Sequence, residues 1–428
     1  MYFFQLHPNI RFRLVTIFLT TLTTNMIFPF MAIYFVKTIG PIATSVFLSI
    51  AVIINFIASI FGGSIADKVG RKKVMVIADA LRVVTFIMFA LSNSPWFDWP
   101  YVTLLFFMVN NVCSGLYSPA SEAMLLDVST SEERKYMYSV MYWISNLSIA
   151  LGGTIGALFF SDYLFVLFVI LSIASIVSTL ITLFFITETY FPKEGAAKNG
   201  DGNKKLNEVK GLLQNYKEVV RDRIFILFVL SSTLLFSLEA HLTNFISIRL
   251  ERDISERVLH PFQWKMDGIE LLGILRAENT ICVVLFSVIA TWFIRKYNEK
   301  SILFFGFALY VIGYGVLSYS DSPWILISMM VFAVIGEVIA FPIHQSYLGD
   351  IIPDHLRSSY LAMNRIAMKG SSLIGTLGIY IASVLPTLYV SLFVWLSGII
   401  ALLLFYSIIP AIYERRSIHE QTYNVNVN

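Results

Sequence analysis

The sequence predicts an all-α integral membrane protein with twelve transmembrane helices in two pseudo-symmetric six-helix bundles. Composition is the first reason: 57% of the 428 residues are hydrophobic, 14% are charged and the mean hydropathy is +0.73, which excludes an ordinary soluble domain. The apolar runs are the second reason, because a helix of about 18 apolar residues crosses the roughly 30 Å of hydrocarbon in a bilayer. The alternating segments of an outer-membrane barrel are absent from the sequence.

An internal repeat is the third reason. The positions that a shift of 223 residues superposes are Pro119 with Pro342, Asp127 with Asp350, Arg134 with Arg357 and Gly152 with Gly375. A shift of 224 residues places Arg71 and Lys72 on Arg295 and Lys296. Matching positions in two halves are typical of a transporter built from duplicated bundles, with its binding site at their interface near the middle of the membrane.

Twelve apolar runs define the expected spans, and turn signals such as Gly40-Pro41 and Ser322-Pro323 separate several of them. The predicted spans are residues 12–36, 42–65, 73–92, 100–126, 138–160, 164–187, 224–248, 271–294, 301–320, 323–348, 360–383 and 387–411. The first run is too long for the core of a signal peptide and lacks a small-residue cleavage pattern, so we expect it to remain in the membrane.

The chain has only two cysteines, Cys113 and Cys282, and both lie inside apolar runs. We expect them to be buried packing residues rather than a disulfide or a metal site. No nucleotide-binding loop or paired-histidine motif is present, so the sequence predicts neither a cofactor nor a bound metal.

The polar segment 188–223 divides the chain. It predicts a linker between an N-terminal bundle at 1–187 and a C-terminal bundle at 224–412, with a tail at 413–428. Apolar residues at steps of three and four within it predict an amphipathic helix on the inner membrane surface, or else a solvated helix: Leu206, Val209, Leu213, Tyr216 and Val220. The mixed charges of residues 249–270 predict a short capped helix outside the membrane.

Basic residues set the expected orientation. Of the 31 Lys and Arg residues, 22 lie in the termini and in the loops on the same side, whereas five lie on the opposite side. The positive-inside rule therefore predicts a multi-pass protein of the cell membrane with both termini in the cytoplasm.

The loop at residues 62–73 carries five charges between two apolar runs. Gly63, Asp67, Gly70, Arg71 and Lys72 resemble, in type and spacing, the loop signature between the second and third spans of major facilitator superfamily transporters. Lys68 stands where that family usually has an Arg. The resemblance implies the major facilitator fold and a gating role for these five residues.

Residues 123–156 resemble the LmrP-type multidrug/proton antiporters within that superfamily. The resemblance rests on the Ala123–Ser129 run, the Tyr142-Trp143 pair and the stretch from Asn146 to Gly153. Gly336-Glu337, followed by Pro342 and Gln345, is similar to the same group. The resemblance implies export of lipophilic, often cationic drugs, driven by protons that enter through membrane carboxylates.

Several positions depart from the LmrP-type pattern. Met141 and Thr243 stand where those proteins have acidic residues, and the span-five glycine surface of Gly152 and Gly153 lacks the usual proline. The Arg usual in span four is also absent, and Asn110 lies nearby.

Charged residues inside the spans are candidates for function, because each costs about 2.5–3.5 kcal/mol on insertion scales. They are Asp79, Arg82, Glu122, Asp127, Glu239, Arg276, Glu278, Glu337, Asp350, Arg365 and Lys369. Asp79 and Arg82 are three residues apart, which favours an ion pair on one helix face.

Glu337 is the predicted proton-coupling residue, with Glu239 next. Glu337 stands about fourteen residues into its span, hence roughly 20 Å from one surface at 1.5 Å per residue. We expect substrate contacts from Glu337, Glu239, Glu122, Asn146 and Trp143, although Glu122 is equally suited to a network with Asp127.

Four residues near the inner membrane surface complete the predicted gate. Asp127 and Asp350 each precede an Arg by seven residues, Arg134 and Arg357 respectively. We expect the two carboxylates to contact the basic loops rather than to carry protons. His344, seven residues after Glu337, is suited either to proton transfer or to a structural hydrogen bond.

These observations predict a proton-coupled secondary transporter that exports hydrophobic drugs by alternating access. The alternative is transport of a natural metabolite, an organic anion or a lipid, which Arg82, Arg365 and Lys369 favour. The expected partners are small lipophilic substrates, protons and the bilayer, without nucleic acid, and the expected state is a monomer. An enzyme is not expected, because no clustered catalytic motif appears.

The predicted topology is testable by chemical labelling. Cysteines placed at Asn203 and in the 413–428 tail should react with a membrane-impermeant reagent only from the cytoplasm, and one at Gln263 only from outside. The reason is the distribution of basic residues, 22 against five. Labelling of positions 203 and 263 from the same face would contradict the span count.

Overall fold

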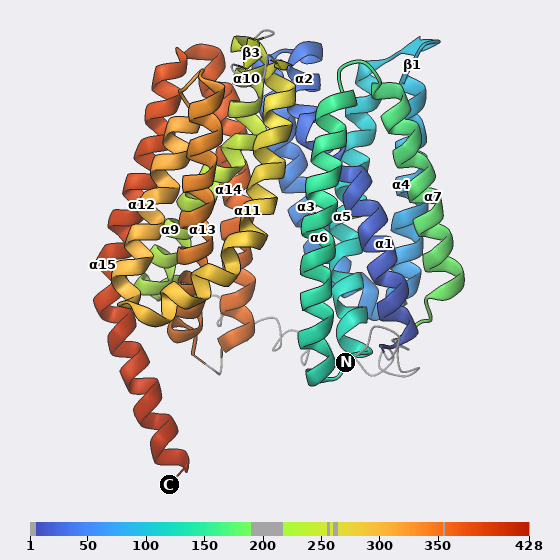
Figure 1. The fold of residues 1–428 in the computed structure, drawn as a ribbon. Helices are drawn as coiled ribbons and strands as arrows, with labels where there is room; N and C mark the ends of the chain where they lie inside the picture. The colour runs from blue at the N-terminus through green and yellow to red at the C-terminus, as the bar shows by residue number, and fades with distance from the viewer. Residues whose placement is uncertain (1–5, 190–216, 255–256, 260–263, 354–355, 428) are drawn as a thin grey trace. The chain divides into compact units, whose positions relative to one another are not determined.

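The computed structural model describes residues 6–189, 217–254, 257–259, 264–353 and 356–427. The described chain is helical except for two short antiparallel hairpins (Figure 1). The helices are α1 (Pro8–Asn25), η2 (Phe28–Phe30), α2 (Met31–Ile39), α3 (Pro41–Val69), α4 (Arg71–Ser92), α5 (Pro100–Asp127), α6 (Ser131–Phe159), α7 (Leu164–Phe185), α9 (Arg223–His241), η3 (Leu242–Ile246), α10 (Ser247–Asp253), α11 (Gly268–Lys296), α12 (Glu299–Leu317), α13 (Pro323–Ile351), α14 (Arg357–Val384) and α15 (Thr387–Val427). The hairpins are β1 (Asn93–Ser94) with β2 (Phe97–Asp98), and β3 (Arg257–Leu259) with β4 (Trp264–Met266).

Eleven helical segments within the described residues are long and apolar enough to cross a membrane. Each of them coincides with a predicted span, and α11 occupies the place of the remaining one. The all-helical transmembrane prediction is therefore confirmed. The predicted helix around Leu206 falls largely outside the described residues.

The chain forms two compact units. Unit 1 comprises Met1–Ala196 together with Ser247–Ile281, and unit 2 comprises Ala197–Ile246 together with Cys282–Asn428. The division into bundles at 1–187 and 224–412 remains a prediction.

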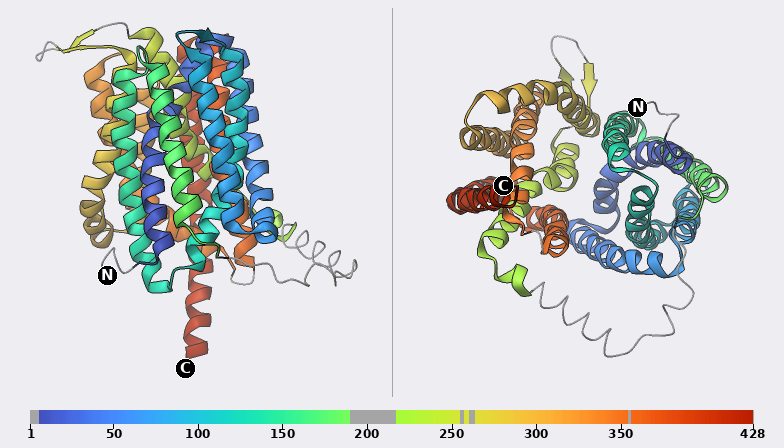
Figure 2. Two further views of the ribbon diagram at one scale, coloured as in Figure 1. Left: turned by 90° about the vertical axis from the view of Figure 1, so that its right-hand side faces the viewer. Right: turned by 90° about the horizontal axis from the view of Figure 1, so that it is seen from below.

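Unit 1 is built from long helices that run side by side (Figures 1 and 2). Its main packing pairs are α3 with α5, α4 with α5, α4 with α7, and α1 with both α6 and α7. Its core includes a cluster around Met75, Ala120 and Met124, all shielded from solvent. The short helix α10 packs against α2, and Lys37 forms an ion pair of 2.5 Å with Glu251 across that contact.

Unit 2 has its closest helix pair in α12 and α13, while α9 packs against α14 and α15. Gly306 and Gly336 make the α12–α13 contact possible. A Cβ atom at Gly306 would lie 2.8 Å from the Gly336 carbonyl oxygen, and one at Gly336 would lie 2.6 Å from the Tyr310 nitrogen. Only glycine allows the two backbones to approach this closely. Helix α15 continues well past the ends of its neighbours (Figure 1).

Two predicted spans differ from single continuous α-helices. The run at 12–36 starts earlier, at Pro8, and is interrupted by the 3-10 turn η2, whose Pro29 cannot donate a backbone hydrogen bond. The run at 224–248 passes through the π-helical turn η3 into α10. The segment 249–270 contains the end of α10, which continues the span from α9 instead of forming the separate capped helix that the charges predict, and the β3–β4 hairpin, which the sequence did not indicate.

A carboxylate joins three helices of unit 2. Asp222 is the N-cap of α9 and accepts hydrogen bonds from the backbone nitrogens of Ile224 and Phe225. Arg415 of α15 donates two bonds to it, at 2.7 and 2.9 Å, and Tyr360 of α14 donates one at 2.8 Å. Burial alone would raise the pKa of Asp222, but the bonds from Arg415 and Tyr360 outweigh burial and lower it.

The Asp222 contacts predict a pH-dependent contribution to stability. Because the pKa is lowered in the folded protein, the stabilisation is present at neutral pH and is lost as the pH falls from about 3.9, the value for an unfolded Asp, through the lower folded value. Asp222→Asn, which keeps a good N-cap, should lower the melting temperature at pH 7. The difference from the natural protein should shrink below about pH 4.

Thermal unfolding of the detergent-solubilised protein across this pH range measures the effect. Asp162→Asn is the control, because Asp162 is exposed in the turn between α6 and α7. Equal melting temperatures for Asp222→Asn and the control at pH 7 would contradict the assignment.

Candidate functional site

Unit 1 contains a cavity of about 500 Å³. Side chains from α1, η2, α4, α5 and α6 line it. The lining residues are Arg13, Ile17, Thr20, Thr21, Thr24, Asn25, Phe28, Arg82, Phe86, Asn110, Ser114, Tyr117, Ser118, Ser121, Glu122, Leu125, Tyr138 and Met141. This volume is typical of a site for a small organic molecule.

Arg13 of α1 crosses to α5 at the edge of the cavity. It is 5% exposed, and its guanidinium donates to the hydroxyls of Thr16 at 2.6 Å, Ser121 at 2.6 Å and Tyr117. All three partners are neutral. The predicted span at 12–36 places Arg13 at its very end, whereas α1 begins at Pro8 and carries Arg13 as a buried residue.

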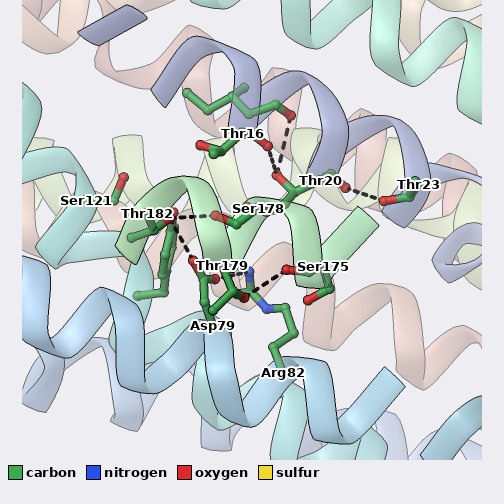
Figure 3. Close-up of polar contacts among 12 residues, drawn as sticks. Thr16, Thr20, Thr23, Asp79, Arg82, Ser121, Ser175, Ser178, Thr179 and Thr182 are labelled. Atoms are coloured by element: carbon green, nitrogen blue, oxygen red, sulfur yellow. Dashed lines mark hydrogen bonds and ion pairs between the residues drawn. The ribbon is translucent and has the colours of Figure 1, made fainter. Parts of the chain in front are cut away.

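Asp79 and Arg82 form the predicted ion pair on α4. Arg82 Nη1 lies 3.2 Å from Asp79 Oδ1, and Thr182 of α7 donates to the other carboxylate oxygen at 3.3 Å (Figure 3). Asp79 is 2% exposed, so the pair and the hydroxyl together satisfy a charge that would otherwise be costly to bury.

Tyr117 lies between the two guanidinium groups. The carbon centres of Arg13 and Arg82 are each 5.1 Å from the centre of its ring, a cation–π arrangement. One aromatic ring therefore holds two like charges at the wall of a single cavity.

The residues predicted to contact substrate are distributed over both units. In unit 1, Glu122 lines the cavity, whereas Trp143 and Asn146 are not among its lining residues. Trp143 is exposed, and the Asn146 amide donates to the carbonyl of Tyr142 one turn earlier. Tyr138 and Met141 are the residues of the same helix that face the cavity.

Glu239 and Glu337 lie in unit 2, on α9 and α13. Glu337 is half-buried and Glu239 is exposed in the structure. Both carboxylates act electrostatically on the fully buried hydroxyl of Tyr310 on α12, so the two acids share one neighbourhood. Arg365 and Lys369 stand on α14 of the same unit.

One hydroxyl and several aromatic rings surround the His344 side chain. Its Nε2 lies 2.9 Å from the Ser232 hydroxyl, and its ring stacks on Phe228 with centroids 4.5 Å apart. Phe307 and Phe405 contact other edges of the ring. This aromatic enclosure favours the hydrogen-bonding interpretation of His344 over proton transfer.

The predicted 62–73 loop is helical on both sides of Gly70, which alone separates α3 from α4, and a distant carboxylate closes the N-terminus of α4. Gly70 has φ of +108°, and the Glu188 carboxylate occupies the space that a side chain at position 70 would need. Glu188 accepts from the backbone nitrogens of Arg71 at 2.9 Å and Lys72 at 3.0 Å. A carboxylate at the first turn of α4 satisfies free N–H groups and the positive end of the helix dipole.

Arg71 links this loop to the end of α5. Its guanidinium forms an ion pair with Asp127 and donates to the Ala123 carbonyl at 2.7 Å, while Asp67 lies 3.9 Å away. Thr189 donates to the same Asp127 carboxylate at 2.9 Å. The expected contact of Asp127 with a basic loop is thus present within unit 1.

The other predicted gate residues have separate partners. Arg134 donates to the Ser129 hydroxyl and to the Leu126 carbonyl at the end of α5. Asp350 lies 4.0 Å from Arg416 of α15. The side chain of Arg357 is outside the described part of the chain.

Three residues of these sites were not predicted from the sequence: Arg13, Tyr117 and Glu188. A signal for part of the cavity was present in α5, where polar residues repeat on one face: Asn110, Ser114, Tyr117, Ser118 and Ser121. No local signal marks Glu188, because its partners are 116 and 117 residues away.

Both the sequence and the fold match known proteins. The family model described as Major Facilitator Superfamily matches residues 14–275 and 258–423. The chain is 31% identical over 363 residues to a Na(+), Li(+), K(+)/H(+) antiporter of Planococcus maritimus, covering 83% of this chain and 84% of the relative. It is 24% identical over 374 residues to the multidrug resistance protein MdtH of Edwardsiella ictaluri, covering 86% and 84%.

Solved structures have the same fold. The peptide transporter POT in complex with sulfate matches with a TM-score of 0.70 and 13% identity, covering 95% of each chain. The nucleoside transporter NupG matches with a TM-score of 0.67 and 15% identity, covering 95% of this chain and 99% of that one.

The positive φ of Gly70 predicts a loss of stability when this residue is replaced. Gly70→Ala should destabilise the protein by about 1–3 kcal/mol from the backbone conformation, and further because a Cβ atom would meet Glu188 at 2.5 Å. Gly349→Ala is the matched control, since a Cβ atom there has nothing within 4 Å. Chemical unfolding of the two variants should separate them, and equal stabilities would contradict the role of Gly70.

Proposed function

The chain belongs to the major facilitator superfamily and is a multi-pass membrane transporter rather than an enzyme; from this premise we propose that it is a proton-coupled antiporter that exports lipophilic, often cationic compounds by alternating access. The observation that carries the proposal is the pair of acids in unit 2. Glu239 and Glu337 belong to different helices and act on the same buried Tyr310 hydroxyl.

Carboxylates in the membrane can carry either protons or the negative charge that holds a cation. A cation bound beside them favours the charged form. Proton binding and cation binding therefore compete, and by linkage each weakens the other by the same factor. This competition is what exchange of a proton for an exported cation requires.

Glu337 is the principal coupling residue in this proposal. It stands in the middle part of α13, directly after Gly336, whose close contact with α12 fixes the helix against Tyr310. Glu239 on α9 supplies the second carboxylate. Glu122, which lines the cavity of unit 1, is the third acid suited to contact a cationic substrate.

The relatives support both the coupling and the cationic substrate. One is named as an antiporter of Na(+), Li(+) and K(+) with protons, and another as a multidrug resistance protein. The 31% identity to the first favours monovalent metal cations as a second class of exported substrate.

The loop contacts support a gating role for Asp67, Arg71 and Asp127, with Gly70 and Glu188 holding the loop in shape. We place this loop and both termini in the cytoplasm, on the distribution of basic residues. The orientation means that protons entering the cell drive export.

Transport into inverted vesicles under an imposed pH gradient tests the proposal. The natural protein should accumulate a lipophilic cationic dye against its gradient, and Na+, Li+ and K+ form a second panel. Glu337→Gln keeps the shape of the side chain and should lose pH-driven accumulation of the dye, because the residue can no longer exchange a proton for a cation. Downhill movement of a neutral substrate should remain.

Asp98→Asn is the control, because Asp98 is exposed in the β1–β2 hairpin. It should transport at the natural rate. Accumulation of the dye by Glu337→Gln at the rate of the control would assign coupling to another residue, with Glu239→Gln the next variant to measure.

A further inference from the structure

The cavity of unit 1 has an excess of hydrogen-bond donors without protein partners. Arg82 uses one nitrogen to bond Asp79 and its guanidinium faces the Tyr117 ring, while its other N–H groups form no hydrogen bond with the described residues. Its side chain is 13% exposed and lines the cavity, so these donors have an open space beside them. A guanidinium with a free edge is suited to a planar, negatively charged group.

Asn110 is a second, independent indication of a ligand. Its side chain lines the cavity and is 8% exposed, yet the amide forms no hydrogen bond with another described residue. A polar group at a cavity wall without a protein partner is available to bond a molecule in the cavity. Ser114 and Ser118, on the same face of α5, likewise have no side-chain hydrogen bond within the described chain.

Arg13 supplies a second positive charge. Its guanidinium donates to the neutral hydroxyls of Thr16, Tyr117 and Ser121, and it forms no ion pair with a carboxylate of the described residues. Because Tyr117 accepts a bond from Arg13, its own O–H remains able to donate. Asp79 pairs with Arg82, also interacts electrostatically with Arg13, and is not among the residues that line the cavity.

The rest of the cavity wall is apolar. Ile17, Phe28, Phe86, Leu125 and Met141 line it together with the polar groups. A volume of about 500 Å³ is much larger than a single inorganic ion needs and falls in the range of sites for organic ligands. The wall therefore suits a molecule with one anionic end and one apolar end.

We propose that this cavity binds amphipathic organic carboxylates, with the carboxylate held by Arg82 and Asn110 and the apolar part against Phe28 and Phe86. Arg13 and Tyr117 are positioning residues that keep a positive potential at the carboxylate end. The site goes beyond the proposed export of cations. It would allow the protein to take anionic or zwitterionic compounds, the latter with their cationic group near Glu122, which lines the same cavity.

Calorimetric titration of the purified full chain in detergent tests the proposal. Phenylbutyrate is the probe, phenylbutyramide is its neutral counterpart, and sodium chloride tests a simple ion site. Phenylbutyrate should bind and the amide should not. Arg82→Lys, which keeps the charge beside Asp79, should weaken phenylbutyrate binding about tenfold or more through loss of the guanidinium donors. Asn110→Ala should weaken it several-fold.

Asp98→Asn is the matched control, because Asp98 is exposed in the β1–β2 hairpin, is not among the residues that line the cavity, and should leave phenylbutyrate binding unchanged. The readout is separate from the proposed coupling, because binding in detergent requires no proton gradient. Equal binding of phenylbutyrate and its amide would overturn the inference. So would binding of chloride without any measurable binding of phenylbutyrate, or natural phenylbutyrate affinity in both Arg82→Lys and Asn110→Ala.

Discussion

The cost of an unpaired charge in hydrocarbon governs the interior of this protein. Because helices pair their own backbone N–H and C=O groups, the cost falls on polar side chains, which need partners inside the bundle. In unit 1 the buried Asp79 has Arg82 and Thr182 as partners, and Arg13 is held by three hydroxyls. These contacts tie α1, α4, α5 and α7 together. The polar network is therefore both a packing element and the wall of the cavity.

The same constraint acts at the helix ends. Glu188 closes the N-terminus of α4 in unit 1, and Asp222 closes that of α9 in unit 2. Each carboxylate lies beside an arginine that leads to a further helix. In unit 1, Arg71 pairs with Asp127 of α5, and in unit 2, Arg415 of α15 bonds Asp222 directly. A single acidic side chain at each place thus joins a helix start to helices far away in the sequence.

The two units carry different charges in their spans. Two arginines line the cavity of unit 1, whereas Glu239 and Glu337 share the Tyr310 neighbourhood in unit 2. Carboxylates are suited to exchange protons for cations, and guanidinium groups are suited to hold anions without titrating. The two units therefore present polar groups of opposite charge.

The sequence by itself determined the class of protein, the positions of the spans and the loop motif, because hydrophobic length and the spacing of Gly70 and Arg71 are local properties. It also identified the Asp79–Arg82 pair, whose members are one helical turn apart. Only the tertiary structure revealed the roles of Arg13 and Glu188. Arg13 meets Tyr117 across 104 residues, and Glu188 meets Arg71 across 117. Such contacts depend on which helices pack together, and no local pattern encodes that choice.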